Sequence, residues 1–346
     1  MGSQAPVPGR GRDSGPVFSG VAAEVIEDTL MHLATENEQY LSELPEQAGL
    51  FKETRIVGEE FIFLLSEKWH LDQSTRYQAV ELLERFMIKQ VEQMCDGRGS
   101  TKGREQGQRS SWSSVRDHIT NTFVLRLVSC VQLASKLSLH YSRVTSDTAL
   151  TFLQSLKYSY TKQELLESEL AVLNTLHFHI NVSTPLAYVE LLLEVLGYNG
   201  CLLPAKPLHQ LCVQLLDFCY LTRETIYDTL LKTAIENSTP SKLQIAKFLT
   251  VKEDFMLLAV GVISTGVFIL SPGHWEQVQS LLKALAPREH SAKVVEHLNC
   301  ITGITPQSIL EFSYAVVRRI VGSTTPEQHR GNCGTKSPED RIPPQK

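Results

Sequence analysis

The chain has 346 residues, a hydrophobic content of 42%, a charged content of 21% and a formal net charge of −5 at pH 7. This composition is typical of a globular protein, and the length predicts two domains or one large domain made of two packed halves. The weakly acidic balance argues against a dominant nucleic-acid or anionic-membrane surface, because such surfaces need clustered basic residues.

The cysteines and the apolar runs indicate a protein of a reducing compartment. The chain has seven cysteines, an odd number, and no two have CxxC spacing, so we expect buried free thiols rather than disulfides or a metal site. The N-terminal segment lacks the apolar core of a signal peptide. The most apolar run, residues 255–270, has 16 residues, fewer than the roughly 20 that a membrane helix needs. We expect a location in the nucleus or the cytosol, without a membrane span.

Three segments rich in glycine, proline, serine or charged residues interrupt or flank the folded region. Residues 1–20 and 322–346 are expected to be disordered tails. The third segment, residues 96–111, carries an excess of basic side chains, namely Arg98, Lys102, Arg104 and Arg109 against Asp96 and Glu105. Two interpretations of this segment remain open: a solvated loop, or a flexible basic contact for an acidic partner or nucleic acid.

Between the tails the apolar residues recur at helical spacing, and strand signals are almost absent. Residues 119–137 are apolar around nearly their whole circumference, which is typical of a helix at the centre of a bundle. Thr161 and Glu164 form a capping box that marks the start of another helix. Thr184-Pro185 and Thr305-Pro306 each place a capping hydroxyl before a proline suited to the first helical position.

The boundary at Thr184-Pro185 divides the chain into two sets of helices. We therefore predict an all-α fold of two tandem lobes of about five helices each, residues 21–184 and 185–321. The helices expected in the second lobe cover residues 185–197, 205–222, 223–236, 251–270, 274–286 and 305–320.

Motifs for catalysis, metal binding or cofactor binding are missing from the sequence. There is no glycine-rich phosphate loop, no HExxH and no serine elbow, and we expect no cofactor. His177 and His179 have no third ligand at a familiar spacing, so no metal is expected there. The paired acids Glu59-Glu60 and Glu253-Asp254 are interpreted as solvated helix faces. The function is therefore expected to be binding rather than catalysis.

Two opposite charges on neighbouring predicted helices are candidates for a contact with a partner. Lys136 lies near the end of the central helix, where the helix dipole favours a cation. Glu169 lies at the edge of the apolar stripe of the next amphipathic helix, a stripe made of Leu165, Leu166, Leu170, Leu173 and Leu176. If the two helices pack together, the pair would be presented on one surface that suits a partner helix.

Three separated stretches, "YQAVELLERFM", "LRLVSCVQLASKLS" and "YTKQELLESELAVLNTLHFHINVSTP", resemble successive helices of a cyclin box, in the order and spacing of that family. The resemblance covers about residues 50–186. Within the cyclin-box family, the chain is most similar to proteins that act in meiotic crossover maturation.

The resemblance implies roles for five positions. Arg55 and Glu84 match an arginine and an acid that brace the first two helices of the box, and Leu125 matches a leucine early in the central helix. Lys136 and Glu169 match residues that contact a cyclin-dependent kinase.

The chain also departs from the pattern of cell-cycle cyclins. Leu137-Ser138 replace an acidic pair after the lysine. The substrate-docking patch of those cyclins would fall on Ile56, Val57, Gly58 and Phe61, where glycine replaces a leucine and phenylalanine a tryptophan. A groove built from these residues is expected to be shallow.

The resemblance implies a non-enzymatic regulator of meiotic recombination that promotes crossover maturation through protein contacts, with a cyclin-dependent kinase and meiotic recombination proteins as candidate partners. Two alternatives remain open: a kinase-independent scaffold linking recombination and ubiquitin-pathway proteins, and a nucleic-acid-binding cyclin-fold protein, which the acidic pI of about 6.1 disfavours. Thr239, in the string Thr-Pro-Ser-Lys, is a candidate phosphorylation site for a proline-directed kinase, or else part of an ordinary loop before a helix.

Overall fold

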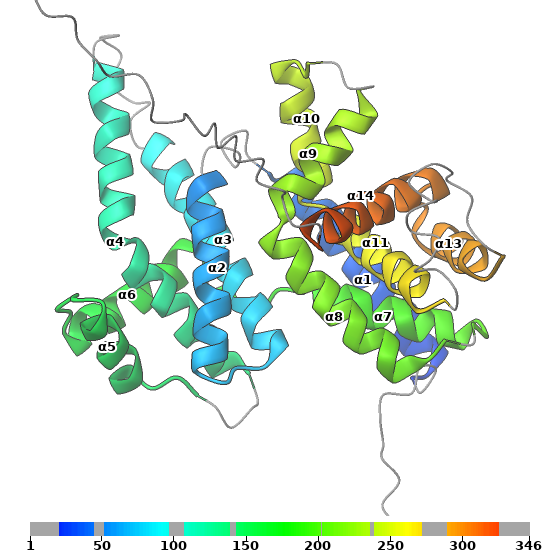
Figure 1. Ribbon diagram of the computed structural model, residues 1–346. Helices are drawn as coiled ribbons and strands as arrows, with labels where there is room; N and C mark the ends of the chain where they lie inside the picture. Colours follow the sequence, from blue (N-terminus) through cyan, green and yellow to red (C-terminus); the bar gives the residue numbers. More distant parts are fainter. Residues whose placement is uncertain are drawn as a thin grey trace, which may run out of the picture.

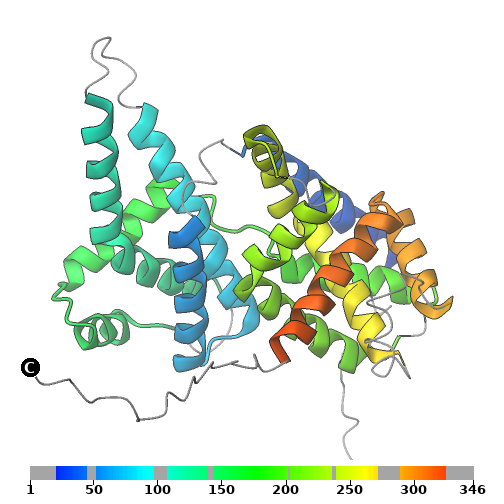
Figure 2. The same cartoon turned by 45° about the horizontal axis from the view of Figure 1, so that its top comes forward.

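The computed structural model describes residues 21–44, 52–96, 107–138, 143–201, 203–235, 239–271 and 289–324. Within these ranges the chain forms thirteen helices and no strand, which confirms the predicted all-α fold. The helices form two groups that lie side by side (Figures 1 and 2). The predicted tails and most of the predicted basic loop, residues 97–106, lie outside the described residues.

The first lobe is built around one long helix. It contains α2 (Lys52–Lys68), α3 (Gln73–Asp96), α4 (Gly107–Leu137), α5 (Ser146–Ser155) and α6 (Lys162–Thr175). Helix α4 packs against each of the other four, and its residues Leu127, Val128, Cys130 and Val131 are completely buried. The central position predicted for residues 119–137 is thus confirmed, because a helix that is apolar on all sides must be surrounded.

The second lobe is built around α11 (Phe255–Leu270), a helix of 16 uncharged residues. Around it lie α7 (Pro185–Tyr198), α8 (Ala205–Leu221), α13 (Glu289–Thr302) and α14 (Pro306–Thr324), and the lobe also includes α9 (Arg223–Ala234) and α10 (Lys242–Lys252). A Cβ atom at Gly261 would lie 2.1 Å from Cδ1 of Phe312, so the glycine permits the close approach of α14 to α11. The run is therefore the buried core helix of a lobe.

Helix α1 (Ala23–Ser42) packs on the second lobe, although it lies in the range predicted for the first. The hydroxyl of Tyr188 donates to the carbonyl of Leu33 at 2.9 Å, and the Asn37 amide donates to Asp254 at 3.0 Å. The ring of Tyr40 stacks on Phe255 with centroids 5.6 Å apart. Figure 2 shows α1 within the group formed by the helices of the second lobe, so the first described helix lies on the second lobe and the next, α2, on the first.

All three predicted helix starts are confirmed. Thr161 accepts a hydrogen bond from the Glu164 amide at 3.2 Å, while Glu164 accepts from the Thr161 amide at 2.8 Å. Thr305 accepts from the Ser308 amide at 3.2 Å. Helix α7 begins as predicted, with Thr184 at the capping position and Pro185 at the first helical position, but the buried side chain of Thr184 makes no cap hydrogen bond.

Several predicted boundaries differ from the observed ones. Helix α4 begins at Gly107, inside the predicted loop, and α14 continues to Thr324, inside the predicted tail, because no proline interrupts either sequence at these points. Helices α10 and α13 were not predicted. The predicted helix at residues 274–286 lies outside the described residues.

Candidate functional site

Lys136 and Glu169 form an ion pair at the junction of α4 and α6. The ammonium nitrogen of Lys136 lies 2.5 Å from Oε1 and 2.7 Å from Oε2 of Glu169. Lys136 occupies the last turn of α4, where the helix dipole favours a cation. The sequence therefore identified two residues, 33 positions apart, that the fold brings into contact.

The two charges are not equally accessible. The side chain of Lys136 is 43% exposed, whereas that of Glu169 is only 7% exposed. The amide of Gln132, with its nitrogen turned toward Glu169, donates to Oε1 at 3.0 Å, and its oxygen accepts from the Ser146 amide at 3.2 Å. The expectation that both charges lie on the surface is thus wrong for Glu169, because α6 turns this carboxylate toward the polar groups of α4 and α5.

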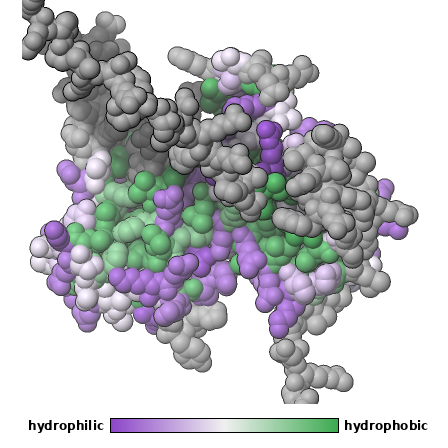
Figure 3. Space-filling view, in the orientation of Figure 1, coloured by the Kyte–Doolittle hydropathy of each residue, from purple (hydrophilic) through white to green (hydrophobic). Residues whose placement is uncertain are grey.

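Exposed leucines lie close to the two members of the ion pair along α4 and α6. Leu166 and Leu170, one turn apart on α6, are 42% and 51% exposed, and Leu137, next to Lys136, is 39% exposed. The predicted apolar stripe of α6 therefore divides, since Leu165 and Leu176 are buried in the core. Figure 3 shows apolar residues gathered on this face of the first lobe, in the region of α2 and α6. A cation beside exposed leucines is suited to docking against an amphipathic partner helix.

Arg55 and Glu84, the predicted brace, are also in contact. Nε of Arg55 donates to Oε1 of Glu84 at 2.6 Å and Nη2 donates to Oε2 at 2.5 Å, a bidentate arrangement between α2 and α3. Arg55 also contacts Glu59, one turn further along α2, at 3.2 Å. Both carboxylates are nearly inaccessible, since the side chains of Glu59 and Glu84 are 3% and 7% exposed.

The contacts of Arg55 continue into the second lobe, which the sequence did not predict. Its Nη1 and Nη2 atoms donate to Glu253, between α10 and α11, at 2.5 and 3.1 Å. Glu253 also accepts from Arg223, the first residue of α9, at 3.0 Å. On the other side, Glu81 of α3 accepts from the hydroxyl of Tyr220 of α8 at 3.1 Å. We call this set the interlobe cluster; it comprises Arg55, Arg223, Glu59, Glu81, Glu84 and Glu253.

Four carboxylates and two guanidinium groups share the interlobe cluster, so the carboxylates cannot all be ionised without a buried net charge. Burial opposes ionisation of Glu253, but the adjacent Arg223 and Arg55 outweigh it and lower the pKa of Glu253 to about 2. Burial, together with the charge of Glu84, raises the pKa of Glu81 to about 8 and that of Glu59 well above its usual value. Burial therefore favours the neutral form of the excess acids, Glu59 and Glu81.

The cluster corrects the interpretation of Glu59 and Glu253 as solvated. Both are buried, at 3% and 2% exposure, whereas their neighbour Glu60 is exposed. Asp254 caps α11 by accepting from the Leu257 amide at 3.0 Å. Glu59 and Glu253 resembled solvated acids because most of their cationic partners are distant in the sequence. Only Arg55, four residues before Glu59, is a local partner.

Leu125 is buried in the first lobe at 8% exposure, among the apolar residues of α4. Its position is that of a core residue, in agreement with a packing role.

The region that corresponds to the docking patch of cyclins is largely closed. A Cβ atom at Gly58 would lie 2.9 Å from Cδ2 of Leu83 and 3.3 Å from Cζ of Phe123, so these side chains fill the space that a leucine would need. The ring of Phe61 packs on Phe152 with centroids 5.8 Å apart. Val57 is 56% exposed, while Ile56 is half-buried. The residues of the predicted patch thus present little more than one valine to solvent.

Thr239 is exposed and lies two residues before Ser241, which caps α10 by accepting from the Gln244 amide at 3.2 Å. Its position is accessible to a kinase, and its modification remains a prediction.

The described residues contain no cluster of metal ligands and no single membrane-spanning helix. No group of three or more histidine, cysteine, aspartate or glutamate residues there is arranged to hold a metal ion. No single described helix is long and apolar enough to cross a membrane; only α10 and α11 together, bent by 66° at their junction, have the length and composition of a span.

Two curated proteins are similar to this chain over most of its length. The mouse (Mus musculus) protein named cyclin N-terminal domain-containing protein 1 is 53% identical over 309 residues, which cover 89% of this chain and 87% of the mouse protein. The human (Homo sapiens) protein of the same name is 53% identical over 311 residues, covering 89% and 88%. The chain belongs to the cyclin N-terminal domain-containing protein 1 family. No protein-family model matches it. The membership confirms the cyclin resemblance drawn from the three sequence stretches quoted above, and extends it beyond residues 50–186 into the second lobe.

Proposed function

We propose that the chain is a non-enzymatic, cyclin-like regulator of meiotic recombination that promotes crossover maturation through protein contacts in the nucleus. Its main contact surface would be the face of the first lobe around Lys136. The observation that supports this proposal is the half-exposed ammonium of Lys136, held against the buried Glu169 and flanked by Leu137, Leu166 and Leu170.

A cyclin-dependent kinase is the partner that this face suits best. The ammonium is positioned but not fully enclosed, so a carboxylate on a partner helix can share it with Glu169. The leucines offer apolar area, and removing it from water favours association.

A double reversal, Lys136→Glu with Glu169→Lys, tests the proposal. The reversal keeps a pair of opposite charges between α4 and α6 but inverts the charge that reaches the surface. We expect it to abolish co-purification of a kinase from meiotic tissue while circular dichroism and melting temperature stay close to those of the parent.

The matched control is Glu224→Lys with Lys252→Glu, which reverses a 2.9 Å ion pair between α9 and α10. This variant should retain the kinase. If the Lys136 and Glu169 reversal also retains it, the assignment of this face is wrong.

A kinase-independent scaffold for recombination and ubiquitin-pathway proteins is the second candidate. It is favoured by Ser138, which stands where cell-cycle cyclins carry an acid and donates instead to Asp72 of its own lobe at 3.1 Å. In that case the parent protein would co-purify with other proteins through the same face, without a stoichiometric kinase.

A further inference from the structure

A cleft separates α1 from α3 and from the segment that follows α6. Its narrower part has a volume of about 240 Å³ and its wider part about 510 Å³, and both are lined by Tyr40, Glu43, Arg85 and His179. The wider part alone falls within the range of about 300–1,000 Å³ that is common for ligand sites. The cleft plays no part in the contacts of Lys136 and Glu169 described above.

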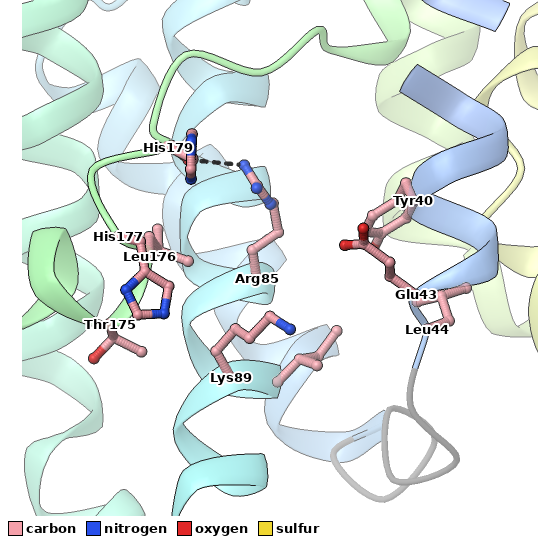
Figure 4. A pocket seen from close by; sticks show the side chains of 10 residues that line it. Tyr40, Glu43, Leu44, Arg85, Lys89, Thr175, Leu176, His177 and His179 are labelled. Carbon is pink, nitrogen blue, oxygen red and sulfur yellow. Dashed lines mark hydrogen bonds between the residues drawn. The ribbon is translucent and has the colours of Figure 1, made fainter. Parts of the chain in front are cut away.

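One wall of the cleft is basic. Arg85 and Lys89 lie one turn apart on α3 and line the cleft together with His177 and His179; in Figure 4 Lys89 extends toward α1 and Arg85 toward His179. Arg85 donates one hydrogen bond to the carbonyl of His179 at 3.1 Å. Since a guanidinium carries five donors, most of its capacity is left for a ligand.

The backbone after α6 is shaped so that both histidines reach this wall. His177 and Phe178 have φ angles of 49° and 62°, in the left-handed region that non-glycine residues rarely adopt. Phe178 is 62% exposed and does not line the cleft, whereas His177 and His179 on either side of it do. Strained backbone of this kind often occurs at binding sites, and here it places two histidines in the lining of the cleft.

The opposite wall is acidic. Glu36 and Glu43 are seven residues apart on α1, which places them two turns apart on one face. Oε1 of Glu36 accepts from the Ser183 amide at 3.2 Å, while its buried Oε2 accepts no hydrogen bond and lies 3.9 Å from His32. This wall therefore has unused capacity to accept hydrogen bonds.

One charged residue of each wall interacts with a neighbour on its own helix. Gln39 of α1 donates to Glu43 at 2.9 Å, and Lys89 contacts Glu92 of α3 at 3.0 Å. Exposed pairs of this kind are weak because solvent screens them, so a ligand can displace them. The cleft thus presents opposite charges across an open gap.

We propose that this cleft binds an extended segment of a protein partner that carries a phosphoserine or phosphothreonine close to a lysine or arginine. The phosphate would lie on the wall of Arg85, Lys89, His177 and His179, and the cationic side chain on the wall of Glu36 and Glu43. A phosphate monoester carries about 1.5–2 negative charges and three acceptor oxygens, which matches several converging donors better than a carboxylate does. The opposed walls would fix the direction in which the segment binds.

The test uses immobilised degenerate peptide libraries with a fixed central phosphoserine, serine or glutamate, and the full-length protein. We expect at least about tenfold stronger retention on the phosphoserine library, equivalent to about 1.4 kcal/mol, with lysine or arginine enriched among the bound sequences. Arg85→Ala with Lys89→Ala should remove this preference. Glu36→Gln with Glu43→Gln should keep the preference for phosphate and lose the enrichment of basic residues.

Two controls separate the site from general charge effects and from misfolding. Lys232→Ala with Lys247→Ala removes two exposed cations of the second lobe and should leave binding unchanged. Lys89→Ala alone, which changes only an exposed pair, should weaken phosphopeptide binding at an unchanged melting temperature. Equal retention on the serine or glutamate library, or an unaltered preference in the Arg85 and Lys89 variant, would overturn the proposal. The double reversal at Lys136 and Glu169 should still bind phosphopeptides, so the cleft and the proposed kinase contact can fail independently.

Discussion

Arg223 gives the sharpest test of the interlobe cluster, because the cyclin resemblance assigns it no role. The side chain is buried, donates to the carbonyl of Lys252 at 2.5 Å and to Glu253 at 3.0 Å, and lies 3.7 Å from Glu59 and 3.9 Å from Glu84. Substitution by methionine removes the charge but keeps an apolar stem against Tyr220 and Tyr227, whose ring centroids lie 5.8 and 5.9 Å from the guanidinium carbon. The variant therefore isolates the electrostatic contribution.

We expect Arg223→Met to lower the free energy of unfolding by about 3–5 kcal/mol at pH 7, the range for removing one partner of a buried ion pair. At about 2 °C per kcal/mol for a chain of this size, the melting temperature should fall by roughly 6–10 °C. Lys232→Met, an exposed change on the same helix α9, should stay within about 1 °C of the parent since surface substitutions have small effects.

Thermal unfolding followed by circular dichroism measures the effect, and a double-mutant cycle locates it. Combining Arg223→Met with Glu253→Gln should cost less than the sum of the single changes, with a coupling energy of about 1–3 kcal/mol. A melting temperature of Arg223→Met as high as that of Lys232→Met would refute the idea that the cluster joins the lobes.

Three further predictions concern buried positions in the interlobe cluster and in each lobe. The pKa of Glu81 is about 8 in the folded protein against 4.5 in the unfolded chain, so its stabilising contribution is complete below pH 4.5 and is lost as the pH rises to 8. Glu81→Gln should therefore flatten the decline in melting temperature between pH 5.5 and 8.5. The exposed change Glu60→Gln should leave that decline unchanged. Gly58→Leu should destabilise by about 1–3 kcal/mol in denaturant titrations, because Leu83 and Phe123 occupy the space; an unchanged midpoint would contradict this packing. Gly261→Ala, with its Cβ 2.1 Å from Phe312, should destabilise much more than Gly266→Ala on the same helix, where the closest atom lies at 3.0 Å; equal midpoints would count against the close approach of α14.

The features that the sequence predicted are those that depend on local pattern or on a family motif. The all-round apolar character of residues 119–137 predicted the central helix, and Thr161 and Glu164 predicted the start of α6. Motif order was sufficient to pair Arg55 with Glu84 and Lys136 with Glu169, because each motif fixes the helix on which its residue lies.

The features that could not be predicted depend on contacts between distant parts of the chain. Glu253 is 198 positions from Arg55, and nothing local distinguishes it from a solvated acid. The placement of α1 on the second lobe also depends on tertiary contacts, such as that of Asn37 with the Phe255 amide at 3.1 Å. The exposure of Leu166 and Leu170 could be predicted only in part from the sequence. It follows once Glu169 is known to face α4, because that orientation turns these two leucines outward.

The interlobe cluster changes how the brace of the cyclin box must be understood in this chain. Arg55 is shared between Glu84 of its own lobe and Glu253 of the other, at equally short distances of 2.5 Å. A first lobe without the second would leave Arg55 short of one carboxylate and Glu59 without Arg223, and buried groups that lose a partner cost far more than exposed ones. Helices α2 and α3 carry the brace, and α3 packs directly on α4, the helix that ends in Lys136. The second lobe therefore contributes to the rigidity of the face that carries Lys136, even though it adds no residue to that face.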